Sequence, residues 1–313
     1  MQTPLRLSAT RIAAARREIA PALRDTPCWS NGGLSRALGC ELVVKDETRG
    51  SLGCFKGRGA DLFVAQWRGS GPLVCASAGN FGLALADAGH RRGVAVVVFV
   101  ATTASPFKVA RIRERGAEVI EHGIDFDAAK AAARAHGGMW VEDGAEVAIS
   151  EGAGTVAAEL DAGLDAIVVP VGNGALIAGI GTWLRAHHPQ TQVIGVCAAG
   201  APVMRTCWQH GLAAAPANAR ADTIADGIAV RVPVAEAVAD LAHVIDDLVT
   251  VEDAELLAAM RSLHALTGIA AEPSAVAGLA AIAADRDRFA GRRVATILTG
   301  NNLTRDQHTR WLG

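Results

Sequence analysis

Lys56 lies in the stretch best suited to covalent chemistry, 51–60, which reads SLGCFKGRGA. Only four of the 30 basic residues are lysines (Lys45, Lys56, Lys108 and Lys130), so each deserves consideration as a reactive group. Unlike arginine, a buried lysine can lose its proton and act as a nucleophile or base. Glycines beside Lys56 would let a ligand approach the backbone closely. This stretch alone fits two interpretations: a lysine that forms a Schiff base, or an ordinary surface lysine in a turn.

A second stretch, 75–82 (CASAGNFG), ends an apolar run and opens an expected helix. The first N–H groups of a helix have no acceptor within it, and they favour negative charge. With the Ser77 hydroxyl and the Asn80 amide beside them, these groups could hold a carboxylate. The alternative interpretation is a helix-capping turn that binds no ligand.

A third stretch, 169–179 (VPVGNGALIAG), also leads from a strand-like run into a helix. Small residues at Gly172, Gly174 and Ala175 leave several N–H groups free to face one anion, and the helix dipole favours a phosphate there. No Gly-Lys-Ser/Thr follows, which excludes a Walker A motif, and the glycine spacing does not favour a dinucleotide. A tight strand–helix turn packed on the sheet is the alternative.

The fourth stretch, 297–302 (ILTGNN), follows the last expected strand. Polar side chains at the carboxyl ends of parallel strands commonly face a ligand crevice, although a capping turn is possible here too. A reactive lysine, a carboxylate cradle, a phosphate cradle and the Thr299 hydroxyl together suit one ligand. That ligand is pyridoxal 5′-phosphate (PLP) joined to an amino acid.

Alternating strand-like and helical segments must position these four stretches. The expected strands are 41–45, 72–76, 94–100, 117–121, 139–141, 165–171, 192–197, 244–251 and 294–298. The expected helices are 8–23, 54–67, 81–92, 105–116, 125–136, 154–160, 176–187, 254–266 and 274–284. This alternation predicts open parallel sheets with helices on both faces. The glycine-rich segment 137–154 is the expected crossing between sub-domains.

Composition excludes several classes of protein. The 313 residues carry a net charge of −2 with both signs spread along the chain, so nothing suggests nucleic-acid binding. The longest apolar runs, such as 94–101, are far shorter than the roughly 20 residues of a membrane helix, and we identify no signal peptide. The six cysteines form no C-x-x-C pair, so we expect no zinc site and a reduced, cytoplasmic protein.

Seven motifs, in this order, resemble the serine/threonine dehydratase family of fold type II PLP enzymes, the tryptophan synthase beta-like group. They are KDE at 45–47, FKGRGA at 55–60, ASAGN at 76–80, PVGNG at 170–174, IADG at 224–227, EPSA at 272–275 and TGN at 299–301. The resemblance covers nearly the whole chain.

This resemblance implies an α/β fold with two open, twisted, mostly parallel sheets flanked by helices. PLP would lie in the cleft between a large domain (1–66 and 147–313) and a small mobile domain (67–146). Relatives of this fold are usually dimers, so a homodimer is expected. The partner molecule would be a small amino-acid substrate, with no nucleic acid and no membrane involved.

The resemblance also implies a role for each site residue. Lys56 would carry PLP as a Schiff base, and Phe55 would pack against one face of the pyridine ring. Asn80 would donate a hydrogen bond to the ring's 3-oxygen. Thr299 would meet the pyridine nitrogen, and Glu272 would lie near the cofactor's other side. The substrate carboxylate would be held by Ser77, Ala78, Gly79, Asn80 and Phe81. The phosphate would be held by Gly172, Asn173, Gly174, Ala175 and Leu176.

The implied reaction is β-elimination from a β-hydroxy amino acid, which yields a 2-oxo acid and ammonia. Lys56, once displaced by the substrate, would act as the base beside the α-carbon. The neutral Thr299 hydroxyl would leave the pyridine nitrogen unprotonated, which favours prompt loss of a β-substituent. The alternatives are β-replacement or a threonine-synthase-like reaction, racemisation, and a non-catalytic PLP-binding protein. Racemisation is disfavoured because Ala78 stands where serine racemase relatives carry a serine.

Four features depart from the family pattern. Asn173 and Ala175 interrupt a phosphate loop that is usually nearly all glycine, and Cys54 replaces the usual serine. Phe81 stands where a histidine is usual, and Cys197 where several relatives carry a glutamate that binds a divalent cation. We therefore expect no metal site. We also expect a substrate other than plain serine or threonine, with a bulkier β-group.

Overall fold

In the computed structural model, which describes residues 4–313, the strands form two sheets. The larger sheet has the order β1-β2-β10-β7-β8-β9, and only the β1–β2 pairing is antiparallel. The smaller sheet has the order β5-β4-β3-β6 and is parallel throughout. The larger sheet comprises β1 (Cys28–Trp29), β2 (Glu41–Asp46), β7 (Ala166–Pro170), β8 (Gln192–Ala198), β9 (Asp247–Val251) and β10 (Arg293–Leu298). The smaller comprises β3 (Leu73–Ala76), β4 (Val96–Val100), β5 (Glu118–Glu121) and β6 (Met139–Trp140).

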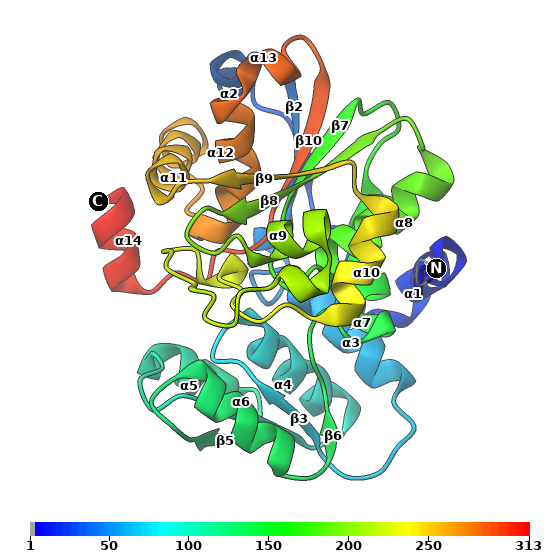
Figure 1. Ribbon diagram of the computed structural model, residues 1–313, viewed down its shortest axis with the longest axis vertical. Helices are drawn as coiled ribbons and strands as arrows, with labels where there is room; N and C mark the ends of the chain where they lie inside the picture. The colour runs from blue at the N-terminus through cyan, green and yellow to red at the C-terminus, as the bar shows by residue number, and fades with distance from the viewer. Residues whose placement is uncertain (1–3) are drawn as a thin grey trace.

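Helices cover both sheets, and the smaller sheet lies below the larger one in Figure 1. In the first half of the chain they are α1 (Ala9–Glu18), α2 (Gly32–Leu38), α3 (Lys56–Gln66), α4 (Asn80–Arg92), α5 (Pro106–Glu114), α6 (Phe126–Ala135) and α7 (Val147–Gly154). The remainder are α8 (Ala175–His187), α9 (Val203–His210), α10 (Ala235–Val244), α11 (Asp253–Thr267), α12 (Ala277–Ala284), α13 (Arg286–Phe289) and α14 (Arg305–Leu312). Within residues 4–313, no helix is both long and apolar enough to cross a membrane.

Alternate residues of the strands pack on opposite faces of each sheet. In β7, Ile167 and Val169 join the core beneath α8 and α10, whereas Ala166 and Val168 join the core beneath α11 and α12. The smaller sheet is likewise covered by α4 on one face and α6 on the other. Strands buried on both faces appear in the sequence as continuous apolar runs. The predicted fold class, two mostly parallel open sheets flanked by helices, is confirmed.

The strands of the smaller sheet fall between residues 73 and 140. They therefore lie within the segment 67–146 that the sequence suggests as a small domain. The domain boundaries and the mobility of this segment stay predictions.

The helix expected at 154–160 is wrong, because α7 ends at Gly154 and only a 3₁₀ turn at Ala157–Glu159 follows. The glycine-rich segment 137–154 was expected as a crossing between sub-domains, and its last glycines lie in α7, where they allow close helix packing. A Cβ at Gly152 would lie 2.7 Å from the carbonyl oxygen of Arg58, and one at Gly154 would lie 2.9 Å from that of Gly179. Both distances are shorter than a side chain tolerates, so α7 crosses α3 and α8 backbone against backbone.

Other segment boundaries also differ from the sequence-based expectations. The helix expected over 8–23 ends at Glu18, and a 3₁₀ turn at Pro21–Leu23 follows. The strand expected over 244–251 begins at Asp247, because Val244 belongs to the end of α10. We did not predict α2, α9 or α10 from the sequence. In α10 the many alanines blur the contrast between an apolar and a polar face, which is the signal that identifies a helix.

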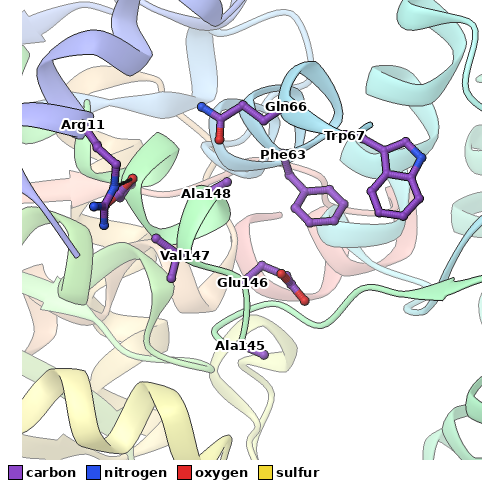
Figure 2. Close-up of a pocket in the computed structure, with 9 residues that line it drawn as sticks. Arg11, Phe63, Gln66, Trp67, Ala145, Glu146, Val147 and Ala148 are labelled. Carbon is purple, nitrogen blue, oxygen red and sulfur yellow. Dashed lines mark hydrogen bonds and ion pairs between the residues drawn. The ribbon is translucent and has the colours of Figure 1, made fainter. Parts of the chain in front are cut away.

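The helices α1, α3 and α7 leave a small cavity of about 340 Å³ at the surface (Figure 2). Phe63 and Trp67 of α3 stack with their ring centroids 6.4 Å apart along one side. Arg11 and Glu151, also in the lining, are hydrogen-bonded to each other at 2.8 Å. The third charged side chain in the lining is Glu146, and burial raises the pKa of its carboxyl. The cavity therefore presents one carboxyl beside a satisfied ion pair.

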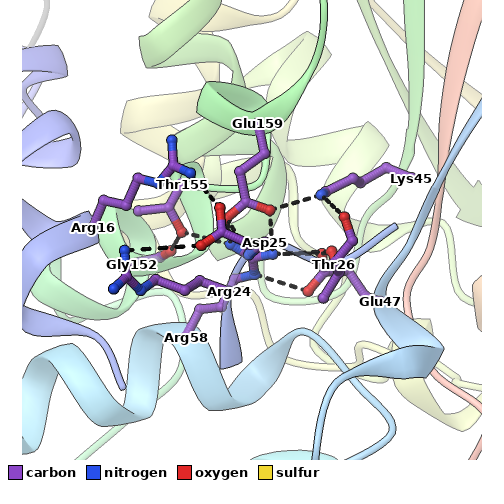
Figure 3. A network of polar contacts seen from close by, with 10 residues as sticks. All are labelled: Arg16, Arg24, Asp25, Thr26, Lys45, Glu47, Arg58, Gly152, Thr155 and Glu159. Atoms are coloured by element: carbon purple, nitrogen blue, oxygen red, sulfur yellow. Dashed lines mark hydrogen bonds and ion pairs between the residues drawn. The ribbon is translucent and has the colours of Figure 1, made fainter. Parts of the chain in front are cut away.

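Beneath the start of α3 lies a buried network of charged side chains (Figure 3). The Arg58 guanidinium donates to both carboxylate oxygens of Glu47 at 2.8 Å and to Glu159 at 2.6 and 2.8 Å. Lys45 donates to Glu159 at 2.7 Å and to the carbonyl oxygen of Thr26 at 2.6 Å. The four charged side chains are at most 4% exposed. Two cations and two anions balance, so the network ties β2 and the turn after α7 to α3.

Folding shifts the pKa values of two of the charged groups in this network. Burial alone would raise the pKa of Glu159, but the hydrogen bonds and charge of Arg58 and Lys45 outweigh it and lower that pKa to about 2. The neighbouring carboxylates raise the pKa of Arg58 despite its burial. Removing one member of a buried ion pair leaves the other charge uncompensated, which typically costs about 3–5 kcal/mol.

We predict that Glu159→Gln lowers the free energy of unfolding by about 3 kcal/mol at pH 7, because it removes an anion from a buried, balanced network. The folded-state pKa of Glu159 lies below its ordinary value of 4.5, so its contribution is present above pH 4.5 and is lost as pH falls toward 2. The difference between wild type and variant should shrink over that window. Urea denaturation at several pH values measures this.

Glu41→Gln is the matched control, since Glu41 pairs with Arg293 at 2.9 Å but is 64% exposed. Exposed pairs contribute about 1 kcal/mol or less, so this variant should change little. Equal free energies of unfolding for the two variants, or an effect of Glu159→Gln that does not depend on pH, would contradict the stabilising role of the network.

Candidate active site

A cavity of about 1200 Å³ opens where strands of both sheets end. Its lining includes all of the residues to which the sequence assigns a role. They are Phe55, Lys56, Ser77, Ala78, Gly79, Asn80, Phe81, Gly172, Asn173, Gly174, Ala175, Leu176, Glu272 and Thr299. Segments separated by up to about 240 residues thus meet at one place, as predicted for strand ends in parallel sheets.

Lys56 is the first residue of α3 and is held beside the end of β10. The backbone N–H of Phe55 donates to the carbonyl oxygen of Thr299 at 3.1 Å. On the other side of the antiparallel bridge between Cys54 and Gly300, the N–H of Asn301 donates to the carbonyl oxygen of Gly53 at 3.0 Å. The lysine and the Thr299 hydroxyl are thereby fixed relative to each other by backbone hydrogen bonds.

The amine of Lys56 pairs with a residue that the sequence did not suggest. Its Nζ donates to Oδ2 of Asp143, whose side chain is 8% exposed. The other carboxylate oxygen, Oδ1, is buried and has no hydrogen-bond partner. Leaving a buried acceptor unpaired costs about 1–3 kcal/mol, so this oxygen requires an explanation. No motif marked Asp143, because its role depends on a contact across 87 residues.

The turn expected to hold a carboxylate lies between β3 and α4. The N–H of Gly79 donates to Oγ of Ser77 at 3.2 Å, and α4 begins at Asn80. The side chain of Phe81 is buried in the core beneath α4, so its position in place of histidine leaves an apolar wall rather than a titratable group. Ala78, the position at which racemase relatives carry serine, offers no proton donor or acceptor from its side chain.

The loop expected to hold a phosphate lies between β7 and α8. The first hydrogen bond of the helix runs from Ala178 N–H to the carbonyl oxygen of Gly174, so the preceding N–H groups have no helical acceptor. Gly174 has φ +91°, a conformation that L-residues rarely adopt. At Gly172 a Cβ would lie 2.6 Å from the carbonyl oxygen of Gly227. Free N–H groups at the positive end of a 13-residue helix fit a phosphate.

A chain of hydrogen bonds crosses the site from one sheet to the other. Arg111 of α5 donates to Oδ1 of Asn302 at 2.7 Å, and Asn302 donates to Oδ1 of Asn80 at 2.6 Å. Asn80 in turn donates to Glu272 at 3.0 Å. The asparagine that contacts Asn80 is therefore Asn302, which lies beyond the Thr-Gly-Asn motif. Two adjacent asparagines after the last strand could have pointed to Asn302 as a site residue. Nothing in the sequence around Arg111 indicated its contact with Asn302.

Glu272 is a buried carboxyl at the edge of the cavity. Burial raises its pKa to about 7, with a further increase from the charge of Asp226 and partial opposition from Lys108. Its backbone N–H donates to the carbonyl oxygen of Gly300 at 3.0 Å, which places it beside the end of β10. Glu272 can therefore hold or release a proton near neutral pH.

Ion pairs along the rim join the helices of the smaller sheet to the segment after α9. Lys108 of α5 donates to Asp226 at 2.5 Å, and Arg231 pairs with Asp127 of α6. These four residues line the cavity. They bridge its opening from opposite sides.

Among residues 4–313, no group of three or more histidine, cysteine, aspartate or glutamate side chains is placed to hold a metal ion. Cys197, at the position where some relatives carry a metal-binding glutamate, is 1% exposed within β8. Burial raises its pKa, and that of Cys54, to about 12, so both thiols stay protonated and unreactive. The expected absence of a metal stays a prediction.

Two mostly parallel sheets that meet at a cavity lined by an amine and by a helix start with free N–H groups are typical of a class of α/β enzymes. The family model described as pyridoxal-phosphate dependent enzyme matches residues 19–300, and the chain belongs to this family. The donor set fits PLP: an amine at Lys56, a hydroxyl at Thr299 and free N–H groups at Ala175 and Leu176 for the phosphate. The resemblance identified from the motifs is confirmed, as is the cofactor.

Three relatives show the range of activities within this family. The chain is 33% identical over 306 residues to the biosynthetic L-threonine dehydratase of Escherichia coli, covering 93% of this chain but only 59% of that enzyme. It is 32% identical over 312 residues to phenylserine dehydratase of Ralstonia pickettii, covering 96% of this chain and 95% of that enzyme. The structure of a PLP-dependent aspartate racemase superposes with a TM-score of 0.88 at 25% identity, covering 97% and 98% of the two chains.

We predict that Asn302→Ala raises the dissociation constant for PLP about tenfold, because Asn80 loses the hydrogen bond that orients it. The neighbouring Asn301→Ala is the matched control: Asn301 is exposed, and its hydrogen bonds are made by its backbone. Titration of the apoprotein with PLP, followed by absorbance, measures both. Equal affinities in the two variants would contradict a positioning role for Asn302.

Proposed function

We propose that this protein removes water from a β-hydroxy amino acid, using PLP, to give a 2-oxo acid and ammonia. One observation carries the proposal: the Lys56 amine, the turn before α4 and the loop before α8 converge on one cavity, and the side chain directly after β10 is a neutral hydroxyl, Thr299. The similarity to two dehydratases supports it. The roles that the resemblance implies for the individual site residues are part of this proposal.

The protein's own groups divide the work by position. The turn 77–81 holds the substrate carboxylate with N–H groups at the start of α4, and the loop 172–176 holds the phosphate. When bound, PLP supplies the electron sink that makes the α-proton acidic. Lys56 accepts that proton, since its side chain lines the cavity. Thr299 adds no negative charge at the pyridine nitrogen, which favours early loss of the β-hydroxyl over a long-lived carbanion.

The substrate that we propose carries a β-group bulkier than that of threonine. The cavity of about 1200 Å³ has to hold PLP as well as the substrate, so the lining of the substrate end, and not the total volume, bears on the β-group. The buried Phe81 and the half-buried Trp140 in its lining are apolar surfaces that suit an apolar β-group. Similarity to phenylserine dehydratase over nearly the full length of both chains supports the same choice. A homodimer in the cytoplasm, with the domain limits suggested from the sequence, is likewise proposed.

The test is to incubate PLP-loaded protein with serine, threonine and phenylserine and to identify the products. We predict 2-oxo acid and ammonia in equal amounts, with the highest kcat/KM for phenylserine. Lys56→Ala should lower kcat about 100-fold or more, because the base is lost.

Each alternative gives a different product in the same assay. A new amino acid would mean β-replacement, an inverted amino acid would mean racemisation, and PLP binding without turnover of any of them would mean a non-catalytic protein. Any of these results would contradict the proposal. Ala78 leads us to expect no inversion, because it supplies no second acid or base.

A further inference from the structure

Asp143 differs from the other acidic residues that line the cavity. Glu142 is hydrogen-bonded to Arg134 at 2.8 Å and to Trp140 at 3.2 Å, and it pairs with Lys130 as well. Asp226 and Asp127 pair with residues on the opposite side of the rim. None of these partners is an amine that PLP is proposed to bind. The partner of Asp143 is Lys56, the one amine that PLP would take away.

The backbone around Asp143 is firmly held. The N–H of Val141 donates to the carbonyl oxygen of Val74 at 2.8 Å, which joins this segment to β3. On the other side, Arg6 donates to the carbonyl oxygens of Ala145 at 2.6 Å and Gly144 at 3.3 Å. The carboxylate therefore cannot simply follow Lys56 when the lysine amine moves to the cofactor. It would be left without a cation, and neither of its oxygens would keep a hydrogen bond seen in this structure.

We propose that Asp143 is the ammonium-binding carboxylate of the substrate site. In the absence of cofactor it holds the ε-ammonium of Lys56. When PLP holds Lys56, it binds the α-ammonium of the incoming amino acid at the same position. The inference rests on the proposed function to this extent: it requires that the cavity accept an amino acid.

The two carboxylate oxygens of Asp143 favour a ligand that carries a cationic group with several N–H donors. An α-ammonium group has three N–H donors, so it can satisfy Oδ2 and also the buried Oδ1 that lacks a partner. Its charge replaces that of the lysine, and the site stays neutral. Carboxylic acids without an amino group bring no cation to Asp143, and N-acylated amino acids bring neither charge nor enough donors. The site should therefore select free α-amino acids before any chemistry occurs.

The experiment compares two ligands that differ only by the amine, glycine and acetate, on the PLP-loaded protein. Neither has a β-substituent to lose, so neither undergoes β-elimination during the titration. Glycine is titrated by the change in cofactor absorbance, and acetate by competition against it. In Asp143→Asn we predict that the dissociation constant of glycine rises about tenfold or more, because a charge-assisted hydrogen bond is lost. That of acetate should change less than twofold.

Glu142→Gln is the matched control, because it removes a charge from the adjacent cavity residue whose hydrogen bonds are already satisfied. It should leave both dissociation constants within about twofold of wild type. PLP content and the thermal unfolding midpoint are measured for both variants. Asp143→Ala provides a second variant should Asp143→Asn fail to load PLP.

The outcomes separate this inference from the proposed reaction. Equal weakening of glycine and acetate, or no weakening of glycine, would overturn the role of Asp143 even if the protein proves to be a dehydratase. Selective weakening of glycine would support that role even if no β-hydroxy amino acid is turned over. Wild-type protein that binds PLP but no glycine would overturn the role of Asp143, and the product assay separately decides the proposed reaction.

Discussion

The structure depends on the balanced ion network beneath the start of α3. Arg58 lies two residues after Lys56, and its guanidinium is held by carboxylates from two other segments, Glu47 and Glu159. Leaving a charge this deeply buried without its partners is costly. The network thus fixes where α3 begins, and with it the position from which the Lys56 side chain enters the cavity.

Two further constraints act on the same helix. Glycines let α7 cross α3 with backbones in contact, and the segment that carries Asp143 leads directly into α7. Backbone hydrogen bonds also tie Phe55 to the end of β10 and so to Thr299. The amine, its carboxylate partner and the hydroxyl therefore come from three parts of the chain that these contacts join. The contacts that pack these helices are therefore also the contacts that position the side chains of the candidate site.

The sequence predicted those features that depend on a short local pattern of residues. Continuous apolar runs predicted the buried strands, and glycine-rich turns after β3, β7 and β10 predicted where a ligand would be held. It missed Asp143, Asn302 and Arg111, because each acts through a contact between distant segments that no spacing reveals. It also placed a helix at 154–160 and missed α7 at 147–154. The glycines of α7 are explained by close helix packing, which only the folded molecule shows.

The central claim is that Lys56 is the amine that holds PLP. Lys108 and Lys130 also line the cavity, and Lys45 lies in the buried network, so the four lysines offer a direct comparison. Borohydride treatment of the PLP-loaded protein fixes the cofactor covalently to the amine that holds it, and peptide mapping then identifies the residue. The account predicts a single pyridoxyl group on Lys56. A label on Lys108 or Lys130, or PLP that is retained without any labelled lysine, would contradict it.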